Sequence, residues 1–149
     1  MKSAEQWLSE YGQSHQNPVN KLIHWICVPF IFLSIIGFLY SVKIGTNLNL
    51  AYFALLFLAV YYFRLSFSLG IGMLIFAILC LGICYLWESS MSWPLWIICA
   101  IVFVVAWIGQ FYGHGVEGKK PSFLKDLQFL LIGPMWLMSF VYRKMGIKF

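Results

Sequence analysis

Residues 22–42 read LIHWICVPFIFLSIIGFLYSV, a long apolar stretch near the start of the chain. It holds no Asp, Glu, Lys or Arg, and its 21 residues are enough for a helix to cross a bilayer. Three further apolar stretches follow at residues 48–63, 65–87 and 94–112. The sequence therefore predicts a helical protein that crosses a membrane several times.

The composition agrees with lipid as the main solvent. Apolar residues make up 62% of the chain and charged residues 10%, whereas soluble domains are nearer half apolar and a quarter charged. The net charge of +5 comes from cations that flank the apolar stretches. A nucleic-acid-binding domain gathers its cations on a soluble face instead, so we expect no nucleic acid partner. The length predicts a single membrane-embedded domain over residues 1–149.

A fifth apolar stretch, residues 127–142, differs from the other four. It has 16 residues and contains Gly133-Pro134, which we expect to interrupt a helix. Its length and this break favour a re-entrant or interfacial segment over a full crossing. The predicted fold is all-α and integral to the membrane, with four transmembrane helices and a carboxy-terminal re-entrant or interfacial helical segment.

The positions of the cations support four crossings. With a cytoplasmic amino terminus and four crossings, nine cations lie inside and only Lys43 lies outside. The nine are Lys2, Lys21, Arg64, Lys119, Lys120, Lys125, Arg143, Lys144 and Lys148. A fifth crossing would move three of them outside, which the positive-inside rule disfavours.

The same topology places all three histidines of the chain, His15, His24 and His114, at the cytoplasmic face. Asn17-Pro18 predicts a helix start between His15 and His24, with Asn17 as the cap. This break lets His15 fold back toward His24, and the glycines beside His114 let the backbone turn tightly there. We expect the three imidazoles to bind a metal, although each alone could be an ordinary histidine with a hydrogen-bonded ring.

Three imidazoles suit iron, zinc, copper or nickel, and their wide spacing matches no zinc finger. The residues expected around them, as partners of the metal ligands or of a substrate, are Tyr11, Asn17, Asn20, Gln110, Glu117 and Lys120. Glu117 is the best candidate to accept an imidazole N–H, or to be a fourth ligand. The alternative for Glu117 is a salt bridge with Lys119 or Lys120, and Lys120 could meet a lipid headgroup or a substrate carboxylate.

Two blocks of sequence resemble the membrane 2-hydroxy-fatty-acid dioxygenases, which include a fungal enzyme of phytosphingosine degradation. The first is Tyr11-x3-His15-x-Asn17-x2-Asn20-x3-His24 with Pro29. The second is Gln110-x2-Gly113-His114-x2-Glu117-x3-Pro121, followed by Gly133-Pro134. One departure is that residues 137–144, LMSFVYRK, carry no acidic residue where the family often has one.

The resemblance implies an iron(II)-dependent oxidoreductase that uses dioxygen to shorten 2-hydroxy fatty acids by one carbon, with release of CO2. It implies that His15, His24 and His114 are the catalytic metal ligands. The expected location is a bacterial inner membrane or the endoplasmic reticulum, among membrane lipid, with the oligomeric state open. The alternative is a non-catalytic membrane protein that binds lipid or metal.

Overall fold

The computed structural model describes residues 2–46, 48–118 and 123–149, most of which are helical. The helices in this part of the chain are α1 Ala4–Gln13, α2 Pro18–Ser41, α3 Leu50–Leu65, α4 Phe67–Ser90, α5 Leu95–Glu117 and α6 Phe123–Lys144. Strands β1 (Lys43–Ile44) and β2 (Leu48–Asn49) form a short antiparallel hairpin between α2 and α3. The predicted all-α class is confirmed.

Three of these helices, α2, α4 and α5, are long and apolar enough to cross a membrane. Helix α3 is apolar too, but its 16 residues fall short of the roughly 20 that a crossing usually needs. Large apolar side chains such as Phe57, Phe67 and Ile108 point outward and are mostly exposed. An apolar outer surface of this kind suits contact with lipid. These features fit a membrane protein, while the number of crossings stays a prediction.

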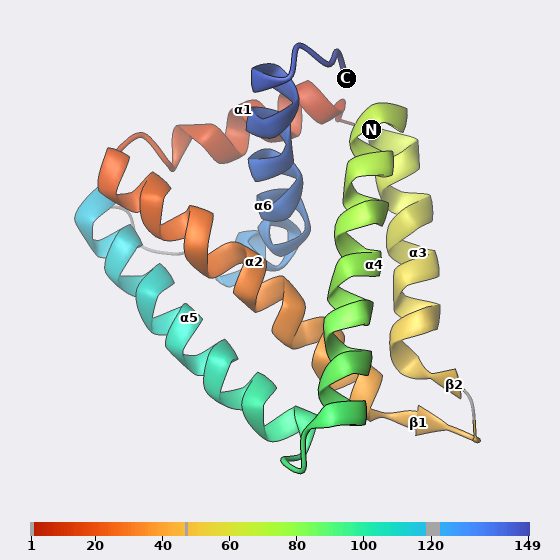
Figure 1. Ribbon diagram of the computed structural model, residues 1–149. Coiled ribbons are helices and arrows are strands. Elements are labelled where there is room, and N and C mark those ends of the chain that lie inside the picture. Colours follow the sequence, from red (N-terminus) through yellow and green to blue (C-terminus); the bar gives the residue numbers. More distant parts are fainter. Residues whose placement is uncertain (1, 47, 119–122) are drawn as a thin grey trace.

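The segments at the helix ends lie on two opposite sides of the molecule (Figure 1). Helix α1, the last turns of α6 and the α3–α4 turn lie on one side. The β hairpin and the α4–α5 connection lie on the other, where Lys43 pairs with Glu88 at 2.6 Å. The first turns of α2 and the last turns of α5 lie side by side, next to the end of α1.

Glycines allow α5 to pack closely on α2. A Cβ atom at Gly113 would lie 2.5 Å from the Asn20 Oδ1 atom, and one at Gly109 would lie 2.6 Å from the Cys27 Sγ atom. An added Cβ at either position would force the facing side chain or the helix to shift, so the glycines permit this close approach. This close approach places His24 of α2 beside His114 of α5.

Helix α6 runs unbroken through Gly133-Pro134, so the interruption predicted there was wrong. Pro134 has no N–H to donate to the Leu130 carbonyl, yet the helix continues past it. Here the Tyr62 hydroxyl donates to the Leu131 carbonyl at 2.7 Å, and the Tyr142 hydroxyl donates to the Ser68 carbonyl at 2.8 Å. These tyrosine contacts tie α6 to α3 and α4.

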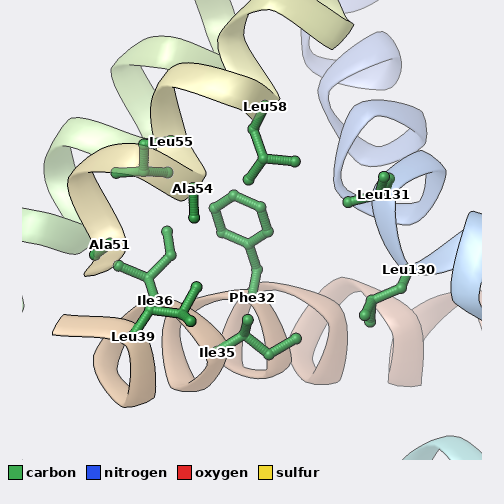
Figure 2. Close-up of a pocket in the computed structure, with 10 residues that line it drawn as sticks. All are labelled: Phe32, Ile35, Ile36, Leu39, Ala51, Ala54, Leu55, Leu58, Leu130 and Leu131. Carbon is green, nitrogen blue, oxygen red and sulfur yellow. The ribbon is translucent and has the colours of Figure 1, made fainter. Parts of the chain in front are cut away.

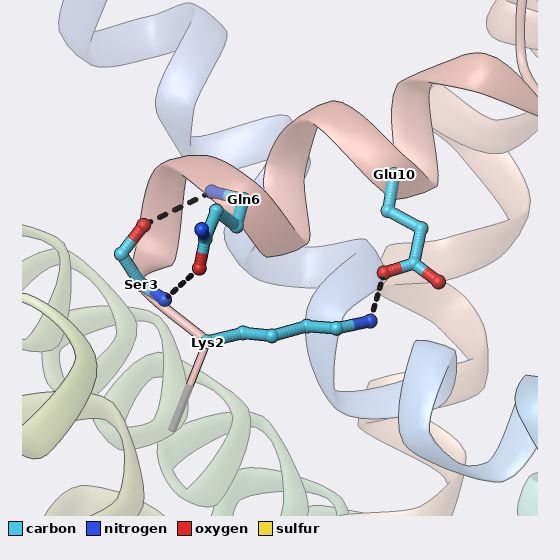
Figure 3. A network of polar contacts seen from close by, with 4 residues as sticks. All are labelled: Lys2, Ser3, Gln6 and Glu10. Carbon is cyan, nitrogen blue, oxygen red and sulfur yellow. Dashed lines mark hydrogen bonds and ion pairs between the residues drawn. The ribbon is translucent and has the colours of Figure 1, made fainter.

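The amphipathic helix α1 begins with a capping box (Figure 3). The Ser3 hydroxyl accepts from the Gln6 N–H at 3.2 Å, and the Ser3 N–H donates to the Gln6 side chain at 2.8 Å. An ion pair between Lys2 and Glu10 spans the exposed face of the helix. The buried face of α1 packs against α6, which brings the end of α1 over the start of α2.

An apolar cavity of about 60 Å³ lies where α2, α3 and α6 meet. Its lining is made only of apolar side chains, among them Phe32, Leu55 and Leu131 (Figure 2). Such a cavity offers no hydrogen bonds, so it suits hydrocarbon better than water.

Candidate metal centre

The structure brings the three histidines together. His15 lies in the turn between α1 and α2, His24 lies on α2, and His114 lies in the last turn of α5. Each offers a ring nitrogen, and these nitrogens all lie within 4.8 Å of one another. The break at Asn17-Pro18 is what turns His15 back, and Asn17 caps α2 by accepting from the Val19 N–H at 2.9 Å.

Hydrogen bonds to the backbone fix which nitrogen carries the proton on two of the rings. The Nδ1 atom of His15 lies 2.6 Å from the Tyr11 carbonyl oxygen, and the Nδ1 atom of His24 lies 2.9 Å from the Asn20 carbonyl oxygen. A carbonyl only accepts, so each Nδ1 must donate. In the neutral rings both Nε2 atoms therefore carry lone pairs, and these atoms face each other at 2.8 Å.

Two lone pairs facing each other at that distance repel, and a cation between or beside them would remove the repulsion. Metal ligands at right angles, each about 2.1 Å from a divalent ion, lie about 3.0 Å apart, close to the observed spacing. A proton shared between the rings would make one ring an imidazolium, which is costly because His15 and His24 are only 2% and 1% exposed. The donor set therefore fits a divalent transition metal, and iron(II) is among those that imidazole binds.

Glu117, in the last turn of α5, holds the connection that carries His15. Its carboxylate accepts from the backbone N–H groups of Gln16 at 2.8 Å and Asn17 at 2.9 Å. It also accepts from the Asn20 side-chain amide at 3.0 Å. Glu117 does not accept from the Nδ1 atoms of His15 and His24, which contact carbonyls, and a role toward the His114 ring stays a prediction. Glu117 instead joins the end of α5 to the start of α2.

Of the other residues expected at the site, all but Lys120 can be placed in the structure. Tyr11 stacks on the His15 ring, with centroids 4.1 Å apart and planes within 10°. Asn20 is fully buried, and its Oδ1 atom lacks a hydrogen-bond partner among the described residues. Gln110 is buried on α5 one turn before His114. Lys120 lies outside the described residues.

The glycines beside His114 do something other than expected. The predicted tight turn at His114 is wrong, because α5 continues through Gly113 and Gly115 to Glu117. The chain turns at Gly118, whose φ of 70° is left-handed. Gly113 serves instead as the point where α5 approaches Asn20.

Trp136 of α6 was missed from the sequence. Its ring lies 5.4 Å from the His15 ring and 5.2 Å from the Tyr11 ring, and it is buried. Gly133 allows this packing, since a Cβ there would lie 2.9 Å from the Tyr11 hydroxyl. In the sequence, Trp136 stands close to Gly133-Pro134, and this was the one hint that it belongs to the site. Its position over His15 becomes visible only from the course of α6.

Comparisons with known proteins show the family of the chain. A family model described as "2-hydroxy-palmitic acid dioxygenase Mpo1-like" matches residues 1–145. The chain is 31% identical over 143 residues to the 2-hydroxy-palmitic acid dioxygenase MPO1 of Saccharomyces cerevisiae, covering 93% of this chain and 79% of the yeast protein. No solved structure matches. The chain therefore belongs to the 2-hydroxy-palmitic acid dioxygenase Mpo1-like family.

Proposed function

We propose that this protein is an iron(II)-dependent dioxygenase that shortens 2-hydroxy fatty acids by one carbon. The reaction is RCH(OH)COOH + O2 → RCOOH + CO2 + H2O, and the substrate supplies every electron that dioxygen takes up. The observation that carries the proposal is the pair of buried Nε2 atoms of His15 and His24, 2.8 Å apart, with His114 beside them. The yeast relative supports the substrate class, because it is named as a 2-hydroxy-palmitic acid dioxygenase.

In this proposal His15, His24 and His114 hold the metal through ring nitrogens. When bound, iron(II) supplies a place where dioxygen and the hydroxy acid can exchange electrons. The Tyr11 and Asn20 carbonyls keep the His15 and His24 rings in the tautomer that presents Nε2.

The aromatic rings around His15 limit access of water to the site. Tyr11 stacks on one side of the ring and Trp136 lies near it, and both are buried. An enclosed site favours the intended reaction over loss of reactive species to solvent. We further propose that four helices cross the membrane and that the site opens on the cytoplasmic face, among the cation-bearing segments.

A direct assay tests this function. Protein purified in detergent is loaded with iron(II) and given 2-hydroxyhexadecanoic acid and oxygen. We expect pentadecanoic acid and CO2 in equal amounts, with one oxygen consumed per acid, and loss of both products after chelation and their return with iron(II). A protein that binds the acid or the metal but forms no shorter acid at full iron occupancy would be the non-catalytic alternative.

A further inference from the structure

A groove of about 440 Å³ runs between α1 and α6 and ends at the first turns of α2. We call it the α1–α6 groove. Its volume lies within the range of pockets that hold small ligands. His15 is among the residues that line it, so the groove runs beside the candidate metal centre.

Two cations line the groove, Lys21 of α2 and Arg143 of α6. The ion pairs among the described residues are Lys2–Glu10 and Lys43–Glu88, so Lys21 and Arg143 have no acidic partner there. Glu5 is the acidic residue of the lining, so cations outnumber carboxylates. The groove therefore favours an anion.

Arg143 also contacts two aromatic rings. Its guanidinium carbon lies 6.0 Å from the centre of the Phe140 ring and 5.7 Å from that of the Phe149 ring. Contacts with ring faces at this distance stabilise a cation and limit its freedom. Less entropy is then lost when Arg143 binds an anionic group.

The groove also has an apolar wall, to which Leu8, Trp136 and Phe140 contribute. Cations and apolar side chains along one groove suit a molecule with an anionic head and a hydrocarbon chain. Arginine and lysine are the usual partners of carboxylates in proteins.

We propose that the α1–α6 groove recognises the carboxylate of the 2-hydroxy fatty acid, with Lys21 and Arg143 as the residues that determine specificity for an acid. This inference rests on the proposed function, since it names how that substrate is selected. Lys21 stands three residues before His24 on α2, so an acid held there is close to the metal ligands along the chain.

The test is a binding titration under nitrogen, because without oxygen the proposed reaction cannot proceed. Iron-loaded full-length protein in neutral detergent is titrated with 2-hydroxyhexadecanoic acid and with its uncharged amide. We expect Lys21→Gln with Arg143→Gln to raise Kd for the acid about tenfold or more and leave Kd for the amide unchanged. Lys21→Arg with Arg143→Lys keeps both charges and should stay within about threefold of wild type.

Lys144→Gln is the matched control, since Lys144 is exposed beside Arg143 and does not line the groove. In turnover with oxygen, the double Gln variant should show a higher KM and a kcat within about twofold of wild type. An unchanged Kd for the acid, or an equal loss for the amide, overturns the proposal while leaving the proposed function intact.

Anionic phospholipid shares the chemistry of a charged head on a hydrocarbon chain. A second titration therefore uses phosphatidylglycerol in mixed micelles. If the double Gln variant loses phosphatidylglycerol binding but binds the acid normally, the groove is a headgroup site and the proposal is wrong. A wild-type protein that neither binds nor converts the acid overturns both the groove and the proposed function.

Discussion

On two rings of the histidine cluster, the position of one proton governs which nitrogen could bind a metal. The carbonyls of Tyr11 and Asn20 hold these protons on the Nδ1 atoms of His15 and His24. In neutral rings the Nε2 atoms then carry lone pairs that face each other, and a cation bound there would relieve their repulsion. This geometry supports the proposal that the histidine cluster binds a metal.

Replacing any of the three histidines with alanine should stop the reaction. We expect His15→Ala, His24→Ala and His114→Ala each to lower kcat/KM at least about 100-fold, because each removes a metal ligand. Circular dichroism and gel filtration in detergent check that each variant is folded. A folded variant with near-normal turnover would show that its histidine is not a ligand.

We expect Glu117 to affect stability and iron binding because it holds the backbone next to His15. Glu117→Gln turns one carboxylate oxygen into an amide that cannot accept, so at least one of three hydrogen bonds is lost. We expect a loss of about 1–3 kcal/mol in the free energy of unfolding and weaker iron binding. Thermal unfolding and iron titration measure both effects.

Glu88→Gln is the control for this change, because Glu88 also loses a charge-assisted contact, with Lys43, but on the far side of the molecule. It should leave iron binding unchanged. Equal effects of the two substitutions on iron binding would remove the special role of Glu117.

Among the helices, the close packing of α5 on α2 brings His114 beside His24. Gly113 is the contact point, whereas a Cβ at Gly115, two residues later on the same helix, would have nothing within 4 Å. The two glycines therefore offer a matched pair of substitutions.

Gly113→Ala should destabilise the protein by about 1–3 kcal/mol, because the added methyl would overlap Asn20. It should also lower iron affinity by displacing His114. Gly115→Ala should be neutral or stabilise by up to about 1 kcal/mol, because alanine favours a helix. Thermal unfolding compares the two variants. Equal destabilisation would show that the contact between Gly113 and Asn20 does not contribute to the stability of the protein.

Some elements could be predicted from sequence and others could not. Long apolar runs predict helices because the length and composition of one segment suffice, and α2, α4 and α5 follow them. The continuity of α6 through Gly133-Pro134 could not be predicted, because a proline inside an apolar run does not tell whether the helix continues past it. Contacts that join α6 to α3 and α4, such as those of Tyr62 and Tyr142, depend on the tertiary fold. The helix α1 was not predicted, since its short polar sequence is stabilised by packing on α6.

The topology of the molecule brings together histidines that are far apart in the chain. The distribution of lysine and arginine predicts that His15, His24 and His114 share one face, and the structure places their nitrogens together. The cover that Trp136 gives to His15 was not predictable, because charge counts say nothing about how helices pack.

The predicted topology has its own test. In a variant without native cysteines, single cysteines replace Lys43 and Lys148, and a membrane-impermeant thiol reagent is applied to intact cells. We expect labelling at position 43 only, with position 148 reacting after the membrane is opened, because four crossings place these sites on opposite sides. Labelling of both sites from outside would contradict four crossings.

X-ray absorption at the iron K-edge gives a direct test of the proposal that His15, His24 and His114 bind a catalytic iron. For iron(II)-loaded wild-type protein we predict nitrogen or oxygen neighbours of the iron at about 2.1 Å. We also predict the outer-shell scattering that marks histidine rings, fitted best by three imidazoles. A spectrum without imidazole scattering would show that the histidines do not bind the iron.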